Sequence, residues 1–117
     1  SLYIMRKFIL DKHVKGKEAE NLAQIYFLKK GYHVFSNISQ QGCIDMIVVN
    51  KDNELLKIDV KCVSRRKRDN HKVNRSRTPL QDELDVKILY VDTDRKECYF
   101  YKKDKNHLKR RTKVEKI

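Results

Sequence analysis

The sequence is poor in residues that mark secreted, zinc-binding and low-complexity proteins. Its 117 residues include 3 glycines, 1 proline and no tryptophan, which argues against a long disordered or collagen-like chain. The three cysteines and four histidines are scattered without metal-ligand spacing. Neither a zinc site nor a disulfide framework is therefore expected, and the cysteines are expected to be reduced thiols.

Long hydrophobic runs are also missing. The longest uncharged apolar runs are about half the roughly 20 residues that span a bilayer, which excludes a transmembrane helix. The first residues, SLYIMRK, have no apolar core and no small-residue cleavage site, so no secretion signal is expected. The expected location is therefore the cytoplasm, and no membrane partner is expected.

Acidic residues are outnumbered by basic ones, and the excess is concentrated in two segments. The chain has 28 Lys and Arg against 16 Asp and Glu, a formal net charge of +12. Residues 65–77 carry seven basic residues and one acid, residues 102–116 carry eight and two, and the rest sums to zero. Such clustering is typical of polyanion binding, with a solvated loop and a frayed tail as open alternatives. Neither segment has the large apolar face of a membrane-binding helix, which favours nucleic acid.

Apolar periodicity predicts one helix followed by strands. An i, i+3, i+4, i+7, i+8 stripe predicts an amphipathic helix over 15–30, ended by Gly31; it consists of Ala19, Leu22, Ala23, Tyr26 and Phe27. Strands are expected at 32–35, 44–49, 55–63, 84–91 and 97–101. A turn at 51–53 joins the second and third of these into a hairpin, and residues 64–80 show no regular pattern.

These elements predict a single domain over residues 1–117. The expected class is α/β (α+β), with a mixed central sheet of about five strands and an N-terminal helix. The basic residues form an insertion at 65–77 and a C-terminal tail at 102–117.

Two acids and a lysine occupy unusual places in the predicted hairpin. Asp45 lies in an otherwise apolar strand, where a carboxylate is costly to bury without a partner. Asp59 and Lys61 are two apart on the next strand, so their side chains share one face. Paired carboxylates suit Mg²⁺, and a nearby lysine can orient water and neutralise negative charge. A plain surface ion pair and a structural acid remain the alternatives.

The ordered set of motifs resembles the PD-(D/E)xK nuclease superfamily. GKEAE at 16–20 resembles the opening helix of archaeal-type Holliday-junction resolvases, and GCIDMIVV at 42–49 and KIDVK at 57–61 resemble the two active-site strands. LDVKILY at 84–90 and CYFY at 98–101 resemble distal strands of small intron-type homing endonucleases. Two positions depart from the superfamily pattern: Ile44 replaces a proline, and Asp59 replaces the commoner glutamate.

The resemblance implies a restriction-endonuclease-like core and a catalytic site. Asp45, Asp59, the backbone carbonyl of Val60 and Glu20 would bind Mg²⁺, for which Mn²⁺ could substitute. Lys61 would position the attacking water. Glu18 also flanks the apolar stripe of the helix, so periodicity leaves it open as the helix acid, and the motif register favours Glu20. Gln81 is a further candidate for a polar site residue.

The implied function is Mg²⁺-dependent endonuclease cleavage of DNA, in a prokaryotic, archaeal or phage-infected cell. A homing or phage-type enzyme is favoured over a Holliday-junction resolvase, with a restriction-type enzyme third. The alternatives of another class are a non-catalytic nucleic-acid-binding module and a degenerate nuclease fold. DNA phosphates are expected to contact the basic residues that follow the catalytic strand, namely Arg65, Arg66, Lys67, Arg68, Lys72, Arg75 and Arg77. Cutting two strands needs two sites, so a homodimer or higher homo-oligomer is expected.

Overall fold

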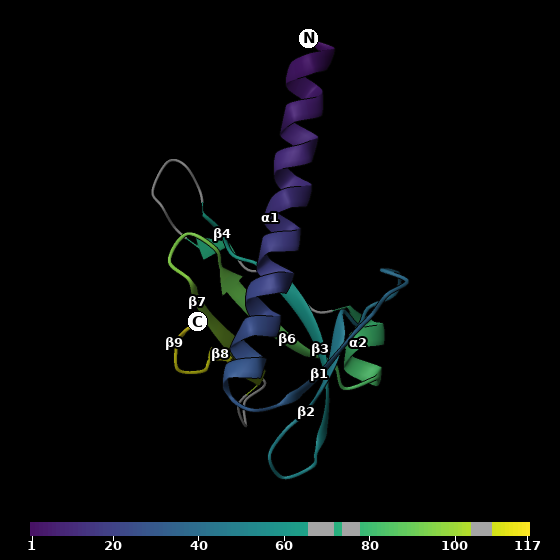
Figure 1. Cartoon of the computed structure of the whole chain (residues 1–117), viewed down its shortest axis with the longest axis vertical. Helices are drawn as coiled ribbons and strands as arrows, with labels where there is room; N and C mark the ends of the chain where they lie inside the picture. Colours follow the sequence, from purple (N-terminus) through teal and green to yellow (C-terminus); the bar gives the residue numbers. More distant parts are fainter. Residues whose placement is uncertain (66–71, 74–77, 104–108) are drawn as a thin grey trace.

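A computed structural model describes residues 1–65, 72–73, 78–103 and 109–117 (Figure 1). Two helices and nine strands lie in these residues, in the order α1 Leu2–Lys29, β1 His33–Ser36, β2 Met46–Val49, β3 Leu55–Cys62, β4 Ser64–Arg65, β5 Lys72–Val73, α2 Pro79–Glu83, β6 Lys87–Asp92, β7 Glu97–Lys103, β8 Lys109–Arg111 and β9 Glu115–Lys116. None of the helices in this part of the chain is long and apolar enough to cross a membrane.

Seven of the described strands form one mixed sheet. Its order is β1-β2-β3-β6-β7-β8, with β9 also paired to β7. The β3–β6 pair is parallel, and the other neighbours are antiparallel. Strands β4 and β5 form a separate two-stranded ribbon. The mixed α+β class is as predicted, but the sheet exceeds the expected five strands because the basic tail contributes β8 and β9.

Helix α1 covers one face of the sheet with the predicted apolar stripe. Ala19, Ala23 and Phe27 are almost fully buried and belong to the same core cluster as Met46 of β2 and Ile58 of β3. Residues that alternate with this core set on β3 therefore point to the opposite face of the sheet. This alternation separates the buried apolar side chains from Asp59 and Lys61.

Helix α1 begins much earlier than the stripe alone indicates. It starts at Leu2, where the Ser1 side chain accepts a hydrogen bond from the backbone N–H of Ile4 at 3.3 Å. Figure 1 shows the first half of the helix projecting beyond the sheet. The apolar side chains of this half stay exposed and do not follow the one-sided spacing that marks a buried helix face. These exposed residues are Leu2, Tyr3, Ile4, Met5, Ile9, Leu10 and Val14.

The C-terminal residues are held against α1 by one acid. The Tyr26 hydroxyl of α1 donates a hydrogen bond to the Glu115 carboxylate, and Lys30 Nζ lies 3.4 Å from the same carboxylate. Strand β9, which contains Glu115, pairs with β7 through Cys98. This part of the tail is therefore ordered by specific contacts rather than frayed.

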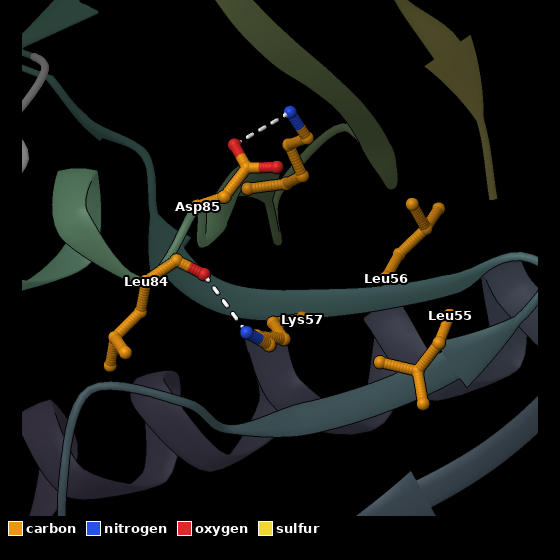
Figure 2. Close-up of a pocket in the computed structure, with 6 residues that line it drawn as sticks. Leu55, Leu56, Lys57, Leu84 and Asp85 are labelled. Carbon is orange, nitrogen blue, oxygen red and sulfur yellow. Dashed lines mark hydrogen bonds and ion pairs between the residues drawn. The ribbon is translucent and has the colours of Figure 1, made fainter.

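The segment before β6 differs from the expected strand at 84–91. Residues 79–83 form α2, which Thr78 caps, and β6 starts only at Lys87. Lys57 Nζ on β3 donates a hydrogen bond to the backbone oxygen of Leu84 at 3.1 Å, as Figure 2 shows beside the Asp85–Lys87 ion pair. This bond fixes the end of α2 against β3.

Candidate active site

The hairpin of β2 and β3 brings Asp45 beside Asp59. Met46 pairs with Ile58 across the two strands, and the Asp45 N–H donates to the Ile58 oxygen at 2.9 Å. Continuing this register by one residue places Asp45 opposite Asp59. The Asp45 carboxylate accepts a hydrogen bond from the backbone N–H of Val60 at 2.7 Å. Asp45 lies just before β2, although the sequence predicts it inside the strand.

Asp59 is buried and is bound by two side-chain donors. Its exposed fraction is 6%. Its Oδ2 atom forms an ion pair with Lys61 Nζ at 3.0 Å and accepts a hydrogen bond from Gln81 Nε2 at 2.8 Å. Lys61 lies on the same face of β3, as the i, i+2 spacing predicts, and its side chain remains partly exposed. A buried carboxylate thus meets an ammonium group that solvent can reach.

Burial and the neighbouring carboxyl group raise the pKa of Asp45 to about 7. Desolvation is the largest cause, followed by a side-chain hydrogen bond with Asp59; the charges of Asp59 and Glu20 add to it. The Val60 N–H acts in the opposite direction because it stabilises the ionised form. Near neutral pH the Asp45 carboxyl group therefore readily holds a proton, and a bound cation would favour its ionised form.

The two candidate helix acids point to different parts of the molecule. Glu20 lies 3.7 Å from Lys17, and its charge reaches Asp45. Glu18 instead lies 3.9 Å from Lys96, in the turn between β6 and β7. Glu20 is therefore the helix acid whose charge contributes to the raised pKa of Asp45, whereas Glu18 is engaged by Lys96.

The two carboxylates suit Mg²⁺, which keeps part of its water shell, better than they suit a cation that takes all its ligands from the protein. Within the described residues, no group of three His, Cys, Asp or Glu side chains lies close enough together to hold a metal ion. Asp45 and Asp59 nevertheless supply two hard oxygen ligands whose proximity disfavours full ionisation. Mg²⁺ commonly binds one or two carboxylates and completes its shell with water and substrate phosphates. A two-carboxylate site suits that ion.

Gln81 is a site residue that the sequence indicated only weakly. It is 2% exposed, and its Nε2 donates to Asp59 and to the backbone oxygen of Cys43 at 3.4 Å. Its Oε1 accepts from the Thr78 N–H at 3.1 Å, and the Thr78 hydroxyl accepts from the Gln81 N–H at 3.2 Å. This capping box fixes Gln81 against the site. The sequence TPLQ at 78–81 carries the signature of such a helix start: a Thr followed three residues later by Gln, with Pro at the first helical position.

The predicted DNA-contacting residues fall mostly outside the described residues. Arg65 and Lys72 are paired through their backbones in the β4–β5 ribbon. The other five are not among the described residues, namely Arg66, Lys67, Arg68, Arg75 and Arg77. The ribbon follows β3 directly, so the chain enters this segment four residues after Lys61.

Comparisons with known proteins show the fold. No protein-family model and no curated protein sequence matches the chain. Among solved structures, the chain is similar to the bacterial homing endonuclease I-Ssp6803I, with a TM-score of 0.63 and 20% sequence identity. The match covers 75% of this chain and 66% of that one, just under two thirds of its length. At this identity the likeness establishes a shared α+β fold.

Proposed function

We propose that this chain is a Mg²⁺-dependent DNA endonuclease of the PD-(D/E)xK type, with homing or phage-type cleavage as its role. One observation carries the proposal: Asp45, just before β2, lies opposite Asp59 of β3, and Lys61 Nζ lies 3.0 Å from Asp59. The similarity of the fold to a homing endonuclease supports the same conclusion.

The side chains of the site have distinct roles in this proposal. Asp45 and Asp59 would hold Mg²⁺, with the backbone carbonyl of Val60 and with Glu20 directly or through water. When bound, the ion supplies stabilisation of charge on the phosphoryl oxygens and lowers the pKa of water. Lys61 orients the attacking water and neutralises developing negative charge. The hydrogen bond from Gln81 holds the Asp59 carboxylate in place.

DNA is the partner that the charge distribution favours. The net charge of +12 and the basic residues of 65–77 provide phosphate contacts next to the catalytic strand. Such contacts carry affinity without sequence information, so the recognition sequence rests on other groups. A DNA-binding role alone would leave the pair of half-buried Asp45 and buried Asp59 without a use.

The decisive experiment is a cleavage assay on a DNA pool diverse enough to include an unknown recognition sequence. Fragmented genomic DNA and a labelled four-way junction would be incubated with the protein, with Mg²⁺, with Mn²⁺ or with chelator. New ends would be mapped by sequencing. We expect cuts that require the divalent ion and that Asp59→Asn protein fails to make, which also excludes a contaminating nuclease. Binding of both substrates without such cuts would favour the non-catalytic module and overturn the proposal.

The preferred substrate separates the two nuclease alternatives. Cuts at one or a few recurring duplex sequences would identify a homing or phage-type enzyme. Symmetric cuts in the four-way junction, independent of sequence, would identify a Holliday-junction resolvase.

We further propose that two copies act together, because two strands require two sites. The surface we assign to their contact is the side of the exposed first turns of α1 that carries Tyr3 and Leu10. The two residues are 75% and 61% exposed, and neither lines the cleft described below.

The assembly can be tested by light scattering with paired substitutions on α1. The protein is expected to be a dimer, and Tyr3→Gln combined with Leu10→Gln is expected to shift it to monomer. These two residues are seven apart and share one side of the helix. Leu28→Gln is the matched control, since Leu28 is an exposed apolar residue at the other end of α1. A monomer with and without DNA would contradict the proposal.

A further inference from the structure

An open cleft of about 840 Å³ lies along α1 and ends at Glu20. It is formed mainly by one side of the helix and by Gln40 of the β1–β2 connection; the lining residues that matter here are Lys12, His13, Gly16, Lys17, Glu20 and Gln40. Gln40 belongs to the connection that ends at Asp45, and the Asn37 N–H at the start of this connection donates to the Asp45 backbone oxygen at 2.9 Å, so the cleft leads towards the carboxylate pair. No role in the proposed site accounts for a groove of this size.

The charges along the cleft suit a polyanion. Lys12 and Lys17 are exposed, and His13 lies beside Lys12. Lys17 is 58% exposed and lies 3.7 Å from Glu20, so its ammonium group stands at the junction of the cleft and the site. Gln40 adds an amide donor from the opposite wall. Ammonium and amide groups of this kind contact phosphate oxygens without reading bases.

At Gly16, helix α1 presents no side chain to the cleft. It lies in the interior of α1, where glycine is less favourable than any residue except proline. It has no positive φ that would demand glycine. A Cβ added at this position would have no heavy atom within 4 Å among the described neighbours, so close packing in the protein does not demand it either. A ligand that approaches the helix closely would explain a glycine here.

We propose that this cleft holds the sugar–phosphate backbone of the DNA strand that enters the site at Asp45 and Asp59. The strand would pass over Gly16, with Lys12 and Lys17 contacting successive phosphates. This inference rests on the proposed function, since it assumes that DNA is the substrate. It assigns DNA contacts to α1, separate from those predicted for residues 65–77.

The test measures DNA binding in chelator, so that cleavage does not interfere. A fluorescein-labelled 20-base-pair duplex would be titrated with wild-type protein and with Lys12→Gln/Lys17→Gln, Gly16→Gln and Lys29→Gln proteins at several salt concentrations. We expect the double lysine variant to bind about tenfold more weakly, with a salt slope smaller by about two. Lys29 lies in the last turn of α1, away from the cleft lining, and its substitution should change the affinity less than twofold.

Gly16→Gln separates occupancy of the cleft from loss of charge or loss of fold. The substitution keeps the net charge and improves helix propensity, so the melting temperature should stay the same or rise. The affinity for DNA should nevertheless fall severalfold, because the added side chain fills the path of the strand. If the double lysine variant and Gly16→Gln both bind DNA as tightly as the wild type, this inference is overturned and the proposed function is left intact. A wild-type protein that does not bind DNA at all would overturn both.

Discussion

Replacing Asp59 with Asn is expected to lower Mg²⁺-dependent cleavage about a thousand-fold, which corresponds to about 4 kcal/mol of transition-state stabilisation. The substitution removes the charge of a proposed metal ligand while keeping nearly the same shape. The amide oxygen of the new side chain can still accept the hydrogen bond from Gln81, whose Nε2 lies 2.8 Å from Oδ2 of Asp59 in the wild type, and can stay next to the Lys61 ammonium group, 3.0 Å away. The fold and the affinity for DNA should therefore be retained.

The measurement is the single-turnover cleavage rate with enzyme in excess over DNA. Asp85→Asn is the matched control, because it removes the same charge from an exposed carboxylate that pairs with Lys87. Asp85 also adopts a φ of 55°, a conformation that Asn tolerates well, so the control should fold normally. A rate for Asp59→Asn within tenfold of wild type would remove Asp59 from the metal site.

Metal-free protein is expected to lose stability as the pH rises from about 4 to about 7. In the folded protein the pKa of Asp45 is raised from 3.8 to about 7. Between these values the folded state holds a proton that the unfolded state has released, so unfolding becomes easier with each step in pH. The full shift would correspond to about 4 kcal/mol, and solvent screening at this partly exposed group reduces it to roughly 1–2 kcal/mol.

Asp45→Asn should abolish this pH dependence, because the amide does not titrate and can still accept the Val60 N–H. In chelator, the variant should equal wild type near pH 4 and exceed it by roughly 1–2 kcal/mol at pH 8. Urea unfolding at four pH values between 4 and 8 gives the comparison. Asp52→Asn, an exposed acid in the β2–β3 turn, is the control and should leave the wild-type profile unchanged.

The same titration predicts how Mg²⁺ binding depends on pH. Below pH 7 the ion must displace the proton of Asp45, so its affinity should weaken about tenfold for each further pH unit. Calorimetry with Mg²⁺ at pH 6, 7 and 8 would also record about one proton released per ion at the lowest pH. Equal affinity at all three values would contradict the raised pKa of Asp45.

The part of the site built on one hairpin could be predicted from sequence, because strand geometry is local. The two-residue period places Asp59 and Lys61 on one face, and the turn at 51–53 returns β3 beside β2. The helical stripe through Ala19 and Phe27 likewise required only a 3.6-residue period. The contact between Lys61 and Asp59 at 3.0 Å is as that pattern indicates.

Features that depend on distant contacts could not be predicted in this way. Gln81 reaches Asp59 across 22 positions of sequence, and no periodicity links them. Strand β9 is ordered by the contact of Glu115 with Tyr26, 89 residues earlier, whereas its own composition indicated a frayed tail. The choice between Glu18 and Glu20 needed the location of Lys96, which binds Glu18.

The parallel pairing of β3 with β6 also constrains the order in which the chain folds. Strands β1, β2 and β3 are joined by short connections, so they can pair early and bring Asp45 beside Asp59. Strand β6 can join β3 only after the whole connection between Cys62 and Lys87 has closed, a step with a larger entropic cost. Gln81 lies in that connection. We therefore expect the carboxylate pair to form before its buried amide partner arrives.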